Sequence, residues 1–208
     1  MKRFLLIFCF FISVIQNHSA QVGYGFTVTN DLYHRMVNPK EVGVNASRSA
    51  GSFLLNLGVG PKIWFGNPKF SFSLEAQASL GFLGLSAGDY KGLGTAAFPI
   101  LGKFNFKGLS TFDREGKLGF SLGGGVQYNR TEVYGLTRKF QNEGVTRSFF
   151  TTYIVQAGYG FGISGFTIQG FLRLGYNPDT KANVGHFGIQ YDFNTPMLKK
   201  ITSPESEL

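Results

Sequence analysis

The chain has 208 residues, of which 29 are glycine and 16% are aromatic, and its formal net charge is +8. Its one cysteine is Cys9, so the chain beyond it has no disulfides, cysteine nucleophile or thiolate metal site. The basic residues form no Arg/Lys-rich run, which argues against nucleic acid as a partner. The length suits one domain.

Residues 1 to 20 have the plan of a secretory signal peptide. Lys2 and Arg3 precede an apolar run from Phe4 to Ile15, and small residues end the segment at Ala20. The run is too short to span a bilayer as a helix, which needs about 20 residues. Removing these 20 residues and their two basic charges leaves a mature chain of 188 residues with a net charge of +6.

The rest of the sequence alternates with period 2, and a helical period is nowhere convincing. The pattern is clearest from Phe70 to Phe82, where bulky or apolar residues alternate with small and polar ones. We predict eight strands, each long enough to cross the hydrocarbon core when tilted. They cover residues 22 to 30, 52 to 65, 70 to 82, 94 to 106, 117 to 129, 148 to 163, 166 to 177 and 186 to 193.

Five charged residues lie inside these segments, all on the face opposite to the bulky apolar residues: Lys62, Glu75, Lys103, Arg173 and Asp192. A cationic side chain on the lipid face would cost about 2 to 4 kcal/mol near the bilayer midplane. A sheet in lipid must also close on itself, because its backbone amides have no water to bond. We therefore predict an all-β fold, an eight-stranded antiparallel up-and-down transmembrane β-barrel with the charges inside.

The connections alternate between longer and shorter segments. The longer ones are residues 31 to 51, 84 to 93, 130 to 147 and 178 to 183, and the shorter ones are 66 to 69, 107 to 116 and 164 to 165. Outer-membrane barrels have short periplasmic turns and longer external loops. This asymmetry predicts that both termini lie in the periplasm.

The leader, the strand count, the loop alternation and the closing strand from His186 to Phe193 resemble the small eight-stranded outer-membrane barrels of the OmpA/OmpX type. The resemblance covers residues 21 to 194. It implies a single-domain barrel in the bacterial outer membrane, whose last aromatic residue, Phe193, is read by the assembly machinery. The sequence departs from that family by a tail after the closing strand, which we interpret as a short periplasmic extension over residues 195 to 208.

An interior of eight strands is just wide enough for side chains to fill it. Small inward glycines such as Gly123 and Gly158 make room for the long side chains. We predict a filled core without a solute-sized pore, in which Glu75 pairs with Arg173 and the network also includes Lys103, Lys62 and Asp192. The predicted inward residues are Lys62, Trp64, Glu75, Gln77, Leu101, Lys103, Gln127, Gln156, Gln169, Phe171, Arg173, Gln190 and Asp192.

Catalytic and cofactor motifs are weak. Some barrels of this size modify lipids with a Ser, a His and a carboxylate, but His34 falls in the first long loop and His186 has no serine placed beside it. The Gly160 to Gly165 segment matches a dinucleotide fingerprint, yet a strand follows it instead of a helix. We predict no catalytic residues, no cofactor and no metal site.

The external loops carry a basic excess that fits the phosphates of lipopolysaccharide. Lys91 and Arg147 lie there, beside acidic Asp31, Glu41, Glu132 and Glu143. The predicted lipopolysaccharide contacts are Arg35, Lys40, Arg48, Arg130, Arg138 and Lys139. Tyr24, Tyr128, Tyr159, Tyr176 and Tyr191 stand near strand ends or on the outer face, as in interfacial girdles.

Three functions remain open from the sequence. The first is a monomeric envelope barrel with structural or adhesive loops, in contact with outer-membrane lipid and with an unknown protein partner. The second is an accessory barrel of a secretion or envelope-assembly system, bound through its loops or tail, and the third is an enzyme that modifies lipid A. A soluble lipocalin-like barrel would need the opposite arrangement of apolar and charged faces.

Overall fold

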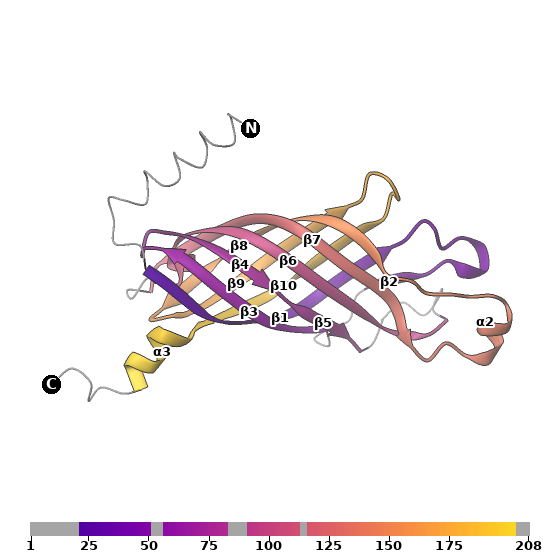
Figure 1. Ribbon diagram of the computed structural model, residues 1–208, viewed down its shortest axis with the longest axis horizontal. Helices are drawn as coiled ribbons and strands as arrows, with labels where there is room; N and C mark the ends of the chain where they lie inside the picture. Colours follow the sequence, from indigo (N-terminus) through magenta and orange to yellow (C-terminus); the bar gives the residue numbers. More distant parts are fainter. Residues whose placement is uncertain (1–20, 51–55, 83–90, 113–115, 203–208) are drawn as a thin grey trace.

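The computed structural model describes residues 21–50, 56–82, 91–112 and 116–202, and the predicted signal peptide lies outside them. The described strands form a barrel with loops at one end and short turns at the other (Figure 1). We call the longer loops and their end external, after the orientation that the sequence predicts. The strands are β1 (Gln21–Val37), β2 (Arg48–Ala50), β3 (Asn56–Gly66), β4 (Phe70–Ala76), β5 (Ala78–Gly81), β6 (Leu93–Lys107), β7 (Leu118–Tyr134), β8 (Phe150–Ile163), β9 (Phe166–Tyr176) and β10 (Asn183–Asn194). The helical elements are η1 (Gly43–Asn45), η2 (Gly108–Ser110), α2 (Arg138–Asn142) and α3 (Thr195–Thr202).

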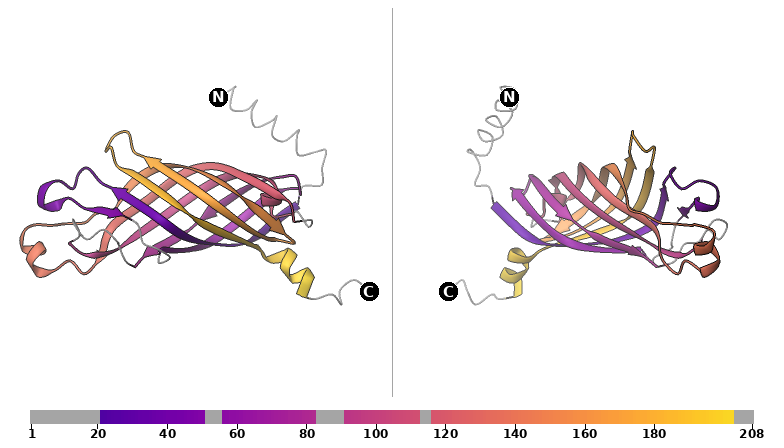
Figure 2. Two further views of the ribbon diagram at one scale, coloured as in Figure 1. Left: turned by 180° about the vertical axis from the view of Figure 1, so that it is seen from behind. Right: turned by 45° about the vertical axis from the view of Figure 1, so that its right-hand side comes forward.

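All strand pairings are antiparallel, and the sheet closes because β1 pairs with both β3 and β10. β4 and β5 each pair with β3 and with β6, so together they form one barrel strand. β2 pairs with β1 beside the external loop, on the same side as β3. β2 and β3 pair with successive parts of the same edge of β1, so we count them as one barrel strand as well. The ten described strands then make eight barrel strands, which confirms the predicted up-and-down barrel. The strands wrap into a closed barrel in the other two views (Figure 2).

The third barrel strand, predicted as continuous, is interrupted at Gln77. The ladder with β6 stops at Ala76 and Ile100 and resumes at Ser79 and Ala97. Between them the Gln77 amide donates to the Pro99 carbonyl over 3.0 Å. Proline has no N–H to donate in return, so the ladder is broken at this point.

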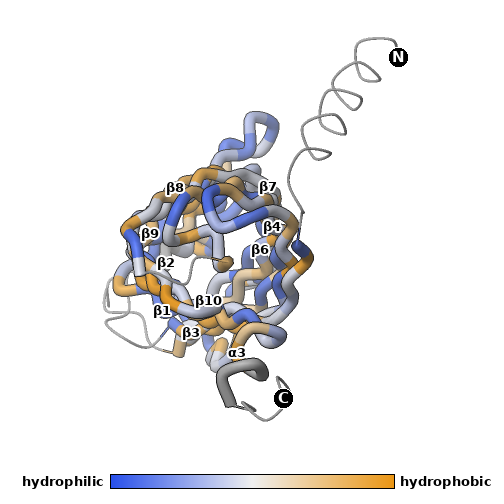
Figure 3. The backbone as a smooth tube through the Cα atoms, turned by 90° about the vertical axis from the view of Figure 1, so that its left-hand side faces the viewer, coloured by the Kyte–Doolittle hydropathy of each residue, from blue (hydrophilic) through white to orange (hydrophobic). Residues whose placement is uncertain are grey.

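The two faces of the sheet differ as predicted. All thirteen residues predicted to point inward are buried, at 5% exposure or less, whereas the large apolar side chains of the other face are exposed. Hydrophilic and hydrophobic residues therefore alternate along the strands (Figure 3). An apolar outside around a charged inside is the arrangement that a bilayer requires.

Two glycines illustrate how the interior accommodates long side chains. A Cβ at Gly123 would lie 2.4 Å from Cγ of Lys103, and one at Gly158 would lie 2.1 Å from Oε1 of Gln169. Real Cβ atoms do not approach that closely. These positions thus make the room that the sequence predicted.

Aromatic rings gather on the outer face near both ends of the barrel. At the end with the turns, Phe26 stacks on Phe193 with ring centroids 4.6 Å apart, and Phe106 stacks on Phe120 at 4.4 Å. The exposed outer-face tyrosines include Tyr24, Tyr128, Tyr159 and Tyr176, while Tyr191 is half-buried. Amphipathic rings in such belts typically lie at the two membrane interfaces. No helix among the described residues is both long and apolar enough to cross a bilayer.

Two strands run further into the predicted loops than the sequence indicated. β1 extends to Val37 instead of ending near residue 30, and a bulge at Leu32 interrupts its alternation. A bulge adds one residue to one strand and so changes which side chains face inward. β7 likewise extends to Tyr134, with a second irregularity around Glu132, where φ is +50°. The predicted ends at residues 30 and 129 were therefore wrong.

Two short segments are helical although the sequence showed no convincing helical period there. α2 lies within the third external loop. α3 follows β10 directly, so the described part of the predicted tail begins as a helix instead of a simple extension. Both helices lie outside the strands and do not alter the barrel (Figure 1).

Candidate functional site

A four-charge cluster occupies the barrel interior. Lys62 of β3 and Glu75 of β4 are directly opposite each other in register, and Lys62 Nζ lies 3.3 Å from Glu75 Oε2. Lys62 Nζ also contacts Asp192 Oδ2 of β10 at 2.7 Å, and Lys103 Nζ of β6 contacts Glu75 Oε1 at 3.0 Å. Two cations thus balance two anions. Balance matters here because a buried ion without a partner carries a large desolvation cost.

Amide side chains connect this cluster to Arg173. Gln190 Nε2 donates to Glu75 Oε2 over 3.1 Å, and Gln156 Nε2 donates to Gln190 Oε1 over 3.0 Å. Arg173 Nε donates to Gln156 Oε1 over 2.8 Å, and its Nη1 donates to Gln127 Oε1 over 3.2 Å. The predicted Glu75–Arg173 ion pair is therefore wrong, because two glutamines lie between these side chains. Arg173 belongs to the polar interior through amide oxygens.

Next to Arg173 lies a histidine cluster that the sequence did not predict. His186 Nδ1 lies 2.7 Å from Asp31 Oδ2, and the rings of His34 and His186 stack with centroids 5.9 Å apart. His186 Nε2 lies 2.9 Å from Nε2 of Gln127. The amide can donate to Nε2, so His186 can hold its own proton on Nδ1 and donate it to Asp31. Asp31 and His34 lie inside the barrel, not in the first loop as predicted, because β1 continues to Val37 and the bulge at Leu32 turns His34 inward.

One hydroxyl group reaches this histidine cluster. Thr95 Oγ1 lies 3.2 Å from His34 Nε2, and Thr95 is 4% exposed. The group lies on the inner side of the barrel wall, whereas acyl chains in the bilayer would contact the outer side. These contacts join Thr95, His34, His186 and Asp31 into one group inside the barrel. Within those strands and the described loops, no three metal-ligating side chains gather.

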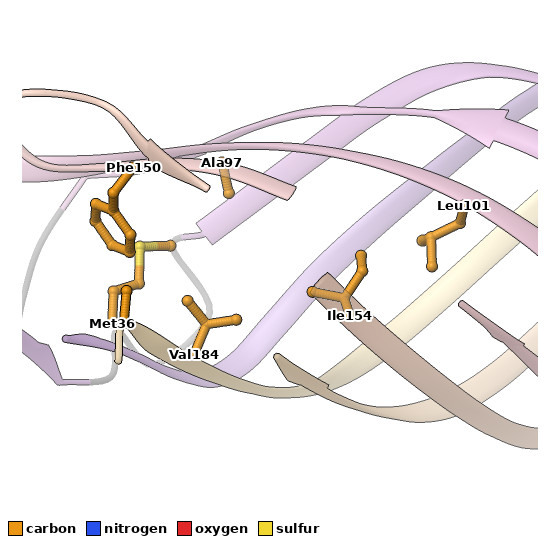
Figure 4. Close-up of a cluster of buried hydrophobic side chains, with 7 residues drawn as sticks. Met36, Ala97, Leu101, Phe150, Ile154 and Val184 are labelled. Carbon is orange, nitrogen blue, oxygen red and sulfur yellow. The ribbon is translucent and has the colours of Figure 1, made fainter. Parts of the chain in front are cut away.

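An apolar cluster fills the lumen toward the external loops. Met36 and Phe150 pack there, with 0% and 7% of their surfaces exposed. Six of its members come from several strands, as Figure 4 shows: Met36, Ala97, Leu101, Phe150, Ile154 and Val184. Ala182, just before β10, is the seventh member. An apolar constriction excludes water and ions. The cluster thus places apolar side chains between the polar interior and the loops at this end.

The opposite end is filled by residues 107–112, the described start of the predicted turn over residues 107 to 116. Leu109 and Phe112 are 1% and 4% exposed, because the turn folds into the barrel. Ser71 Oγ donates to the Ser110 carbonyl over 2.8 Å, and Asn194 Nδ2 donates to the Thr111 carbonyl over 3.3 Å. The turn is thus a plug, which explains its length.

At the external end a buried ion pair links three loops. Glu132 at the end of β7 pairs with Arg147 of the third loop. Arg147 Nη1 donates to the Asn45 carbonyl of the first loop over 2.7 Å, and the Thr146 amide donates to Asn45 Oδ1 over 3.0 Å. Glu132 Oε1 accepts the Lys91 amide of the second loop at 2.8 Å. We call these five residues the loop clasp.

Glu41 lies beside the loop clasp and is 9% exposed. Burial raises the pKa of its carboxyl to about 7, and Glu132 adds to that shift, while Arg147 and a 3.4 Å hydrogen bond from Asn38 oppose it. The carboxyl has few groups to compensate its charge, because Arg147 is already paired with Glu132. At neutral pH, therefore, a large share of Glu41 is protonated.

The first external loop, which contains Glu41, is expected to become more mobile as the pH rises through about 7. The folded state holds more protons than the unfolded state between the ordinary pKa of 4.5 and about 7, so stability falls with rising pH across that interval. A spin label on Val44→Cys, in a mature chain that lacks other cysteines, would report greater mobility at pH 8 than at pH 5.5. Glu41→Gln, which cannot ionise, should remove this difference. An unchanged difference in that variant would assign the effect to another group.

The basic residues predicted to contact lipopolysaccharide do not form one site. Arg35 and Lys40 are exposed near the first loop, and the backbone of Arg48 lies in β2. Arg138 and Lys139 are exposed on α2. The sixth, Arg130, lies on the outer face of β7 with its guanidinium 5.6 Å from the ring centroid of Phe149.

A second basic and aromatic contact lies in the third loop. The Nζ atoms of Lys139 and Lys91 lie 5.7 and 5.4 Å from the ring centroid of Phe140. The second and third loops therefore bring two cations to one ring. This contact of Lys91 could not be predicted, because nothing in the sequence around Lys91 indicates a neighbour in the third loop.

No protein-family model and no curated protein matches the sequence. The chain is similar in structure to Neisserial surface protein A, with 11% identity and a TM-score of 0.49 over 85% of this chain and 99% of that one. It is similar also to Ail, the attachment invasion locus protein of Yersinia pestis, with 9% identity and a TM-score of 0.49 over 83% and 98%. The N-terminal β-barrel domain of Pseudomonas aeruginosa OprF gives 10% identity and a TM-score of 0.41 over 82% and 99%.

Strand pairing and burial, not these distant likenesses, define the class of this protein. The ring is closed by antiparallel pairs, the exposed wall is apolar, and ions and amides fill the inside. Such a surface is suited to lipid and not to water. The chain is therefore an eight-stranded transmembrane β-barrel with a filled interior.

Proposed function

We propose that this protein is a bacterial outer-membrane barrel that acts as a structural or surface-interaction protein through its external loops, and not as a pore. The loop clasp is the observation that supports this function most directly. Because Glu132 and Arg147 hold residues of three loops together, the loops present one joined surface on a rigid barrel. A scaffold that carries such loops is the usual way in which barrels bind partners. Because the apolar cluster fills the lumen toward the loops and residues 107–112 fill it at the other end, we assign the interior a structural role.

The absence of conduction is a direct test of this function. Purified protein in a planar bilayer is expected to give no regular current steps at 100 mV in 1 M KCl, because Met36 and Phe150 close the lumen. The control is Met36→Ala with Phe150→Ala, which removes the two largest side chains near the external end and should raise the frequency of transient currents. Regular steps from the unaltered protein would overturn the proposal in favour of a channel.

We further propose that the outer leaflet contributes a phosphate contact at Arg130. This residue lies two positions beyond exposed Tyr128 on the outer face of β7, and its register partner Ala96 is two positions from exposed Phe98. Arg130 is thus at the external rim of the apolar band, where the phosphates of lipopolysaccharide would lie. Stacking on Phe149 orders its planar group, which suits a charge-assisted hydrogen bond.

Replacing Arg130 should weaken lipopolysaccharide binding. Arg130→Gln removes one charge-assisted hydrogen bond, so the affinity for lipopolysaccharide in detergent micelles is expected to fall about ten-fold. Lys69→Gln, with the same change in charge on a periplasmic turn, is the matched control and should leave binding unchanged. Equal losses in the two variants would mean that only net charge matters and would contradict a local contact.

A further inference from the structure

α3 is attached to the rim of the barrel at the end with the turns. The Asn194 amide donates to the Gly165 carbonyl over 2.7 Å, which fixes the start of the helix on the β8–β9 turn. A Cβ at Gly165 would lie 2.7 Å from Met197 Cβ, so the glycine leaves the room that the helix needs. The helix also contacts β1 and β10. Its first turn is therefore held at a defined height on the barrel.

The start of α3 lies level with the edge of the apolar band on the outer face of the barrel. Phe193, one residue before Asn194, stacks on Phe26 and lies 5.1 Å from the ring of Phe166. These outward rings mark the periplasmic membrane interface. Viewed along the barrel, the coloured start of α3 lies outside the ring of strands and not across its opening (Figure 3). The helix thus begins where lipid headgroups would surround the barrel.

The sequence of α3 divides it into two faces. At 100° per residue, the apolar positions 197, 198 and 201 fall on one arc of the helix, whereas the position of Lys199 lies opposite this arc and that of Lys200 lies to one side of it. No acidic residue occurs between Thr195 and Thr202. A helix with an apolar arc and basic positions is suited to lie in a membrane interface, where its charges meet anionic headgroups.

We propose that α3 is an interfacial helix that binds anionic phospholipid headgroups of the periplasmic leaflet. The proposal rests on the outer-membrane location proposed above. Each lysine near an anionic surface contributes about 1 kcal/mol, so the two together amount to about 30-fold in the binding equilibrium. Phosphate groups of lipid are the partner that fits best, because the helix starts at headgroup height and Met197 lies beside Gly165, the residue before the outward Phe166.

The test uses the mature full-length chain with one cysteine, Thr202→Cys, which carries an environment-sensitive fluorophore. The protein is inserted in vesicles of phosphatidylcholine, either alone or with 30% phosphatidylglycerol, and quenching by neutral acrylamide is measured. Quenching is expected to be at least three-fold weaker in the anionic vesicles, and 0.5 M salt should abolish the difference. Lys199→Gln with Lys200→Gln should also abolish it. Lys40→Gln with Lys181→Gln, an equal change in charge on external loops, should not.

Equal quenching in both kinds of vesicle would overturn the proposal, and so would a difference that persists after both α3 lysines are replaced. Insertion of the barrel is followed separately, by the change in gel mobility of each sample on heating. A chain that does not insert in either vesicle contradicts the membrane location itself. The two failures are therefore distinguishable.

Discussion

Glu75→Gln is expected to lower the free energy of unfolding by about 3 to 5 kcal/mol, the usual cost of removing one partner from a buried ion pair. Glu75 is 3% exposed and compensates two ammonium groups, those of Lys62 and Lys103. In the variant, Lys62 keeps Asp192 as its partner. Lys103 loses the only carboxylate within ion-pair distance of it in the described residues. The measurement is urea-induced or heat-induced unfolding in detergent, followed by gel mobility.

A second substitution identifies which cation depends on Glu75. Glu75→Gln combined with Lys103→Met leaves the balanced pair of Lys62 and Asp192, so most of the lost stability should return. Glu75→Gln combined with Arg173→Gln should instead lose more, because Arg173 donates to glutamines and its removal leaves their oxygens without a donor. Recovery by the Arg173 substitution would support the direct Glu75–Arg173 pair that the sequence suggested.

The barrel and its inward face could be predicted because both follow from one local rule. Side chains alternate along a strand, so the position of Lys103 relative to its apolar neighbours fixes the face on which it lies. The choice of partner does not follow from that rule. Lys62 and Lys103 lie on β3 and β6, the two neighbours of β4 that carries Glu75, whereas Arg173 lies on β9, across the ring. Counting residues from the end of a strand shows how deep a side chain lies in the barrel, but not which strands are its neighbours around the ring.

The remaining errors of the sequence-based predictions lie where the alternation of side chains along a strand is interrupted. The bulge at Leu32 allows Asp31 and His34 both to point inward although they are three residues apart. The period-2 pattern therefore stops before them, and β1 was predicted to end too early. The left-handed backbone of Glu132 had the same effect on β7. Two unexpected features, the His34–His186 stack and the loop clasp, depend on these irregular positions. α3 did carry a signal in Pro196, a residue favoured in the first turn of a helix.

Arg147→Ala should separate the external loops. The substitution leaves the Glu132 carboxylate buried without its cation, at a cost of about 3 to 5 kcal/mol, and removes the hydrogen bond to the Asn45 carbonyl. Because the clasp lies at the ends of strands, the loops are expected to open locally and expose the Glu132 carboxylate to water, while the barrel remains folded. Spin labels on Val44→Cys in loop 1 and Asn142→Cys in α2 would show one narrow distance distribution in the unaltered protein and a broad one in the variant.

Two further variants distinguish the effect of the buried Glu132 charge from the effect of the hydrogen bond between Arg147 and Asn45. Glu132→Gln with Arg147→Ala removes the stranded charge and keeps an oxygen that can accept the Lys91 amide, so stability should recover in part. The distance between loop 1 and loop 3 should stay broad, because Asn45 still lacks the guanidinium that held it. Arg138→Ala, at an exposed residue of the same loop, should leave the distribution narrow. A narrow distribution in Arg147→Ala would mean that the loops are joined by other contacts, and the single surface on which the proposed function depends would not need the clasp.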